Sequence, residues 1–225
     1  MQLDGAVTTR VPFDKSSGMP VSMGEEYSTA ISSSFAASFQ ALIYGLPAKH
    51  SCDALITGFF DDENWRFGYP RTIILPMYDQ MWDAIHTNVA SLNRIKVHWL
   101  TLLFSIFALS PTCVSEDESR KYFLQALTGR RLSEDLFAAS FTASRTTSSV
   151  TEGTAQACLA AVLLSHYMCD RGQASEAWKI IGSAVRHAQN AGLHVGPTWT
   201  KWKDMPHNEQ VMRKAAWLSL ATQDQ

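Results

Sequence analysis

The sequence has few charged residues, no excess of positive charge and no long uninterrupted apolar run. Charged residues make up 18% of the 225 residues and hydrophobic residues 46%, which is typical of a globular chain with a buried core. The formal net charge is −2, so nothing favours a phosphate-binding face on electrostatic grounds. This composition argues against wholesale disorder and against a broad nucleic-acid surface.

The cysteines are few, and their spacing forms no metal-binding motif. Cys52, Cys113, Cys158 and Cys169 are spread over more than half of the chain, and none are in C-x2-C spacing. A structural zinc site needs four ligands that a short closed turn can bring together. We therefore predict scattered buried thiols and no metal ligands, as expected for a reducing compartment.

Targeting and membrane signals are also missing. Residues 1–10 lack the basic and apolar regions of a secretory signal. The longest apolar run covers residues 99–109, much shorter than the roughly 20 residues that span a bilayer. We expect this run to form the central core helix, and we expect no membrane partner.

Apolar residues recur at helical spacing after residue 46, whereas residues 1–45 are rich in Ser, Thr, Gly and Pro. The pattern predicts a flexible tail over 1–45 and a helical domain over 46–225. The fold class is all-α, an irregular antiparallel helical bundle or array. No convincing strand is found, and residues 72–75 form the best strand-like run. The first predicted helix is capped by Ser51 and stops at the acidic run from Asp61. The next helices cover 75–110, run from Ser115 to Gly129, restart at Ser133 and cover 154–170. Ser175 caps a helix over 175–191 with Trp178 on its apolar face, and Asn208 caps the last helix, which has Leu218 on its apolar face.

Local signals fix several helix ends. Ser115 and Glu118 have the spacing of a capping box, and Pro111 ends the preceding helix. Gly192 is placed as a left-handed residue after a helix, with Leu193 folding back on the last turn. Residues 67–70 and 171–173 are predicted as connections.

Candidate chemistry is sparse. Asp61 and Asp62 follow Phe59-Phe60 as in an aspartate-rich site for a metal-bound diphosphate, but Trp65 stands where a further acid belongs. His166 and Cys169 share a helical face without third and fourth ligands. There is no P-loop, no G-x-G-x-x-G and no G-x-S-x-G. We predict no catalytic, cofactor-binding or metal-binding residues.

Basic pairs and tryptophans are given structural interpretations. Arg130-Arg131 and Arg213-Lys214 are read as solvated faces, and His98 and His166 as core or boundary side chains. Five of the seven tryptophans fall on or near predicted helices and are expected in the core. These are Trp65, Trp82, Trp99, Trp178 and Trp217. Trp199 and Trp202 lie in a proline-flanked loop, where a tryptophan is a better candidate for partner binding than on a core helix.

Residues 177–194, AWKIIGSAVRHAQNAGLH, carry a resemblance to a known family. The Trp, the Ala-(aliphatic)-Arg-x-Ala helix and the closing Gly-Leu-His resemble the fungal-specific transcription factor domain, the regulatory region of fungal binuclear zinc-cluster regulators. Residues 209–220, EQVMRKAAWLSL, followed by Asp224, are similar to the next helix of that family. Residues 46–60 and 102–109 resemble its opening and its apolar core helix, so the resemblance covers 46–224.

The resemblance implies a nuclear transcription regulator without catalytic residues. It also implies protein partners, through self-association or coregulators, a small-molecule effector, and control of secondary-metabolite or nutrient-use genes. The cysteine cluster of such regulators is not found in this chain, so DNA contact is expected only indirectly or through a module absent from it. The family pattern also continues beyond Asp224. We therefore expect an incomplete regulatory domain that is less stable or self-associates because its last helix keeps an exposed apolar side.

Two other hypotheses are compatible with the residues. Helices 154–170 and 175–191 would fit a helical-repeat scaffold for protein–protein interaction, although no fixed period recurs. A helical prenyl-diphosphate enzyme would use Asp61 and Asp62, and it would require magnesium.

Overall fold

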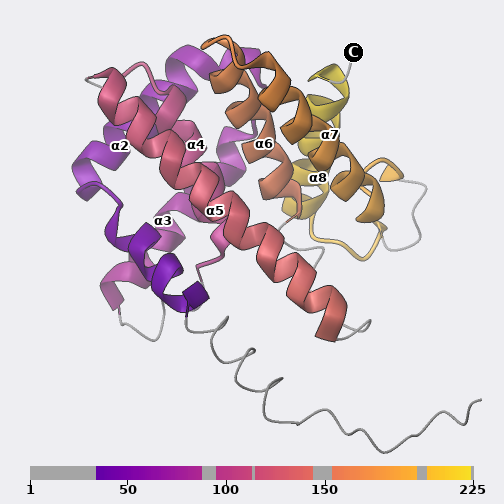
Figure 1. Ribbon diagram of the computed structural model, residues 1–225. Helices are drawn as coiled ribbons and strands as arrows, with labels where there is room; N and C mark the ends of the chain where they lie inside the picture. Colours follow the sequence, from indigo (N-terminus) through magenta and orange to yellow (C-terminus); the bar gives the residue numbers. More distant parts are fainter. Residues whose placement is uncertain (1–33, 88–94, 113–114, 144–153, 197–201, 224–225) are drawn as a thin grey trace, which may run out of the picture. The chain divides into compact units, whose positions relative to one another are not determined.

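The computed structural model describes residues 34–87, 95–112, 115–143, 154–196 and 202–223 (Figure 1). Regular structure in these ranges is entirely helical, which confirms the all-α prediction. The chain divides into two units, Met1–Ala37 and Ser38–Gln225. In the first unit only residues 34–37 are described, and they are helical. Most of the predicted tail therefore lies outside the described residues, and helices α2 to α8 all belong to the second unit.

The described residues of the second unit include seven α-helices, labelled α2 to α8, together with a short π-helix and a short 3-10 helix. In chain order they are α2 (Lys49–Gly58), the π-helix η1 (Phe59–Glu63), the 3-10 helix η2 (Asn64–Arg66), α3 (Arg71–Thr87), α4 (Val97–Leu109), α5 (Glu116–Ala143), α6 (Thr154–Cys169), α7 (Ala174–Asn190) and α8 (His207–Gln223).

The core is built around α4 and α6. Every side chain from Trp99 to Ala108 in α4 is buried, as predicted for the apolar run, and α6 is buried on almost all sides. Helix α4 packs between α5 and α6, and α6 packs in turn against α7 and α8 (Figure 1). The tight turn 171–173 joins α6 to α7, with Gly172 at a φ of 73°. The predicted helical hairpin is therefore confirmed.

The first part of the unit differs from the sequence-based expectation. Residues 38–44, assigned to the tail, are helical, because Leu42 and Ile43 are buried in the core. Helix α2 begins after Ala48, so Ser51 is not its cap; the Ser51 N–H already donates to the Ala48 carbonyl. The acidic run from Asp61 continues the helix as a π turn instead of ending it.

The segment predicted as one helix over 75–110 contains two. Helix α3 starts at Arg71, so the strand-like residues 72–75 are helical, and Ile95 and Lys96 lie outside any helix. Pro76 lies in the second turn of α3, where its missing N–H removes a single intrahelical bond. Helix α4 ends at Leu109 before Pro111, as predicted.

Helix α5 is a single helix of 28 residues, so the predicted break at Gly129 and restart at Ser133 are wrong. Its start is as predicted: the Glu118 N–H donates to Ser115 Oγ at 3.2 Å. Gly129 is a contact residue, because a Cβ there would lie 2.5 Å from Thr101 Oγ1 on α4. The glycine lets the backbones of α4 and α5 approach closely instead of ending a helix.

Replacing Gly129 with alanine should therefore destabilise the domain, by roughly 1–2 kcal/mol, because overpacking against buried Thr101 outweighs the gain in helix propensity. Gly182→Ala is the matched control on α7, where the nearest atom to an added Cβ is the end of Arg186 at 3.7 Å. It should stabilise by about 0.5–1 kcal/mol. Urea unfolding of both variants measures the change in unfolding free energy. A change of the same sign in Gly129→Ala and Gly182→Ala would contradict the role of Gly129 as a close contact between α4 and α5.

Candidate functional site

The family-like stretch at the end of α7 closes in a Schellman motif. Gly192 has a φ of 70°, its N–H donates to the Gln189 carbonyl, and the Leu193 N–H donates to the Ala188 carbonyl at 2.9 Å. Leu193 is buried and covers the last turn of α7. The prediction for Gly192 and Leu193 is confirmed, and the motif fixes the direction in which the chain leaves α7.

Arg213 of α8 is buried against this helix end, so the prediction of a solvated Arg213-Lys214 pair is wrong for its first member. Its side chain is 1% exposed; Nη2 donates to the Ala191 carbonyl at 2.6 Å, and Nη1 lies 3.7 Å from Glu209 Oε1. Burial lowers the pKa of the Arg213 guanidinium, while Glu209 opposes that shift. A cation at the negative end of the α7 dipole therefore ties α8 to α7.

Four further contacts hold α8 against the end of the α7 segment and against the residues that precede α8. The rings of His194 and Trp217 lie 5.7 Å apart. Gln210 Nε2 donates to the carbonyls of Trp202 and Met205, and Lys214 Nζ lies 5.5 Å from the Trp202 ring. The Gly-Leu-His end of the family-like stretch and the helix of residues 209–220 thus meet in one place, where their contacts position α7 and α8.

Several predicted faces and caps need correction. Trp178 is 60% exposed and Leu218 64% exposed, although both were assigned to apolar faces; Ala177 and Ala216 lie inward instead. Gln173 precedes α7 without a side-chain cap, so Ser175 is not its cap. Helix α8 starts at His207, and the Gln210 N–H donates to the Pro206 carbonyl, so Asn208 is not its cap.

The tryptophans divide between core and surface. Trp82, Trp99 and Trp202 are buried, whereas Trp65 is 78% exposed beside the Arg66 guanidinium. Trp199 lies outside the described residues. The prediction that tryptophans on helices lie in the core thus fails for Trp65 as well as for Trp178.

The acidic residues after α2 face basic side chains. Asp61 Oδ1 accepts from Arg71 Nη1 at 2.6 Å, and Glu63 lies 3.5 Å from Arg66. Asp62 is exposed. Among the described residues no group of three His, Cys, Asp or Glu side chains could hold a metal ion, so nothing there supports the diphosphate hypothesis.

The remaining histidine and cysteine candidates are dispersed. His166 Nε2 lies 3.2 Å from Arg66 Nη1 and 3.7 Å from Asp170. Cys169 is exposed, and Cys113 lies outside the described residues. Burial raises the pKa of the Cys52 and Cys158 thiols to about 12, which keeps both protonated and unreactive.

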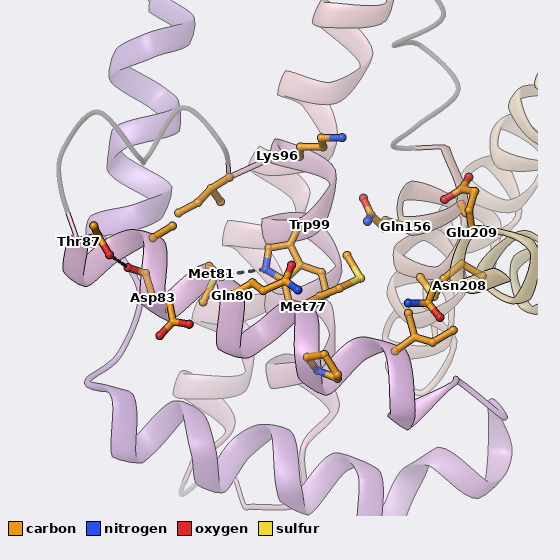
Figure 2. A pocket seen from close by; sticks show the side chains of 16 residues that line it. Met77, Gln80, Met81, Asp83, Thr87, Lys96, Trp99, Gln156, Asn208 and Glu209 are labelled. Atoms are coloured by element: carbon orange, nitrogen blue, oxygen red, sulfur yellow. Dashed lines mark hydrogen bonds between the residues drawn. The ribbon is translucent and has the colours of Figure 1, made fainter. Parts of the chain in front are cut away.

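A pocket of about 680 Å³ lies where α3 faces the starts of α4, α6 and α8 (Figure 2). Its floor is apolar and consists of Ile73, Met77, Met81, Ile95, Trp99 and Met212. Trp99 lies at its centre and donates from Nε1 to Met81 Sδ at 3.2 Å. Polar side chains surround the floor: Gln80, Asp83, Thr87, Lys96, Gln156, Asn208 and Glu209.

One polar atom at this pocket has no partner within the described part of the chain. Gln156 Oε1 is buried there without a hydrogen bond, which is costly for an amide oxygen. In Figure 2 Gln156 and Asn208 reach into the space across from Trp99. The sequence contained a partial signal for the floor, since Met77 and Met81 are four residues apart, but none for Gln156.

His98 on α4 is the described histidine whose titration is shifted most clearly. Burial lowers its pKa to about 4, with a smaller contribution from Lys96. Its Nδ1 is buried and has no hydrogen-bond partner in the described ranges. The folded protein therefore holds His98 neutral at pH values where the unfolded chain would protonate it.

This shift predicts acid sensitivity. The unfolded chain takes up a proton near pH 6.5 and the folded protein only near pH 4, so stability present above pH 6.5 is lost as the pH falls towards 4. Between pH 7 and pH 5 the loss attributable to His98 is about 2 kcal/mol. Urea unfolding of wild type and His98→Gln at both pH values should show a smaller loss in the variant. Equal losses would mean that His98 does not titrate in this way.

Loss of the buried guanidinium should weaken the junction of α7 and α8. Arg213→Met leaves the Ala191 carbonyl and Glu209 without this partner and should cost roughly 2–4 kcal/mol of unfolding free energy. Lys214→Met, at the exposed neighbour, should cost less than about 1 kcal/mol. Thermal and urea unfolding measure the loss of stability in each variant. Similar losses in Arg213→Met and Lys214→Met would show that the buried contacts of Arg213 do not stabilise the junction.

None of the helices in the described residues is long and apolar enough to cross a membrane. Neither the curated proteins nor the solved structures yield a match to this chain. A family model, the fungal specific transcription factor domain, matches residues 90–221, more than half of the 225 residues. The match covers α4 to α7, α8 up to Ala221 and the junction of α7 and α8. It begins after α3 and ends before Asp224, so the resemblances of residues 46–60 and of Asp224 lie outside it. The chain belongs to the fungal specific transcription factor domain family.

Proposed function

We propose that this chain is the regulatory domain of a nuclear transcription regulator of the fungal zinc-cluster class. The observation that carries the proposal is the family match over residues 90–221. In this role the domain responds to an effector and changes the expression of a gene set, such as one for secondary metabolism or nutrient use. DNA is contacted by a module outside this chain.

Protein partners belong to the same proposal. Trp178 on α7 and Leu218 on α8 are large apolar side chains with more than half of their surface exposed. They supply apolar area for self-association or for a coregulator on the outer side of helices whose inner sides are fixed by the core.

The helical-repeat alternative has less support. In a repeat array each hairpin contacts only its neighbours, and no helix is surrounded on all sides. Helix α6 is buried on almost all sides and contacts α4, α5, α7 and α8. That arrangement is typical of the central helix of a globular bundle.

Tethering the chain to a heterologous DNA-binding domain upstream of a reporter gene in fungal cells tests the proposal. We expect the fusion to enter the nucleus and to raise or lower reporter expression relative to the DNA-binding domain alone. The Arg213→Met fusion should lose this effect because its helix junction is weakened, whereas Lys214→Met should keep it. A folded fusion that binds the promoter without changing reporter expression would contradict the proposal.

A further inference from the structure

We propose that the pocket between α3 and the starts of α4, α6 and α8 binds a neutral, mainly apolar, ring-containing small molecule as the effector of this domain. The effector role rests on the proposed function; binding itself does not. The volume of about 680 Å³ falls within the roughly 300–1,000 Å³ of sites that bind small organic molecules. All lining residues belong to the second unit of the chain.

The floor favours a flat apolar body. Trp99 is 4% exposed and Met81 3% exposed, so both are packed firmly from behind while they line the space. Met77 and Met212 add flexible thioether side chains that adapt to the outline of a ring system. The indole and the three methionines that line the pocket offer aromatic and sulfur–aromatic contacts to a ring, but no charge.

The rim favours a neutral molecule with a hydrogen-bonding group at one end. The charged lining residues are Lys96, Asp83 and Glu209, and Glu209 lies 3.7 Å from Arg213, so one charge of each sign remains and the rim selects for neither sign. The amides of Gln156 and Asn208 face the floor from α6 and α8 (Figure 2). Because Gln156 Oε1 lacks a partner in the described residues, rotation of that amide towards a ligand N–H or O–H would satisfy it.

Occupancy of this pocket would add contacts between α3 and α8, whose backbones make little close contact with each other. The backbone of α3 comes less close to the other helices than α4, α5 and α6 come to one another. A molecule in the pocket would contact Met77 on α3 and Met212 on α8, and Met212 precedes the buried Arg213. Binding would therefore hold α3 against the helix that is anchored at the junction of α7 and α8.

The test uses the full chain and N-phenyl-1-naphthylamine, a neutral three-ring molecule with one N–H, whose fluorescence rises in apolar surroundings. We expect saturable binding of one molecule per chain and a higher midpoint of thermal unfolding. Ala84→Trp fills the pocket and should weaken binding at least about ten-fold. Ala174→Trp places the same side chain at the exposed start of α7 and should leave binding unchanged.

A second variant examines the polar end. Gln156→Leu removes the unpartnered amide, so it should preserve or raise stability towards urea while weakening binding of the compound about five-fold. No saturable binding, or equal binding by Ala84→Trp and Ala174→Trp, would overturn the proposed site. An unchanged affinity in Gln156→Leu would overturn the role of the amide. These are binding measurements, so their failure is distinct from failure of the reporter experiment.

Discussion

Burial of α4 and α6 on almost all sides is the constraint on which the rest of the domain depends. A helix without a solvent face must satisfy its polar side chains internally. Thr101 Oγ1 donates to the Val97 carbonyl at 2.9 Å, and Ser105 Oγ donates to the Thr101 carbonyl at 2.7 Å. Ser165 Oγ likewise donates to the Val162 carbonyl within α6. These three hydroxyls are therefore satisfied within their own helices, and apolar surfaces from the remaining helices can cover them.

The size of the covering side chains decides how closely each helix approaches. Helix α5 presents Gly129, and α7 and α8 present buried alanines such as Ala184 and Ala216, so their backbones come close to the core. Helix α3 instead presents Met81 against Trp99, with the indole N–H on the sulfur. Large side chains on both sides keep α3 further away, and the pocket lies beside that contact.

Local signals could be read from the sequence, and tertiary contacts could not. The cap at Ser115 and the left-handed Gly192 depend on a few neighbouring residues, and both were predicted. Gly129 was misread because a glycine at a helix contact has the same sequence signature as one at a helix end. The exposed Trp178 and buried Arg213 reverse the usual preferences of their side chains, since the choice depends on which partners surround α7 and α8. The pocket was missed for the same reason: its walls come from four separate helices.

The boundary of the family match runs through the lining of the pocket. Residues 90–221 include the three helices whose starts line one side of the pocket, together with the junction where Arg213 binds the end of α7. The opposite wall, with Met77 and Met81, comes from α3, which precedes the matched residues. The matched part thus supplies a rigid frame, because its helices are fixed by close contacts and a buried cation. In the proposed site the choice of ligand then falls mainly to α3, whose backbone comes less close to the core helices and whose Met77 and Gln80 line the pocket.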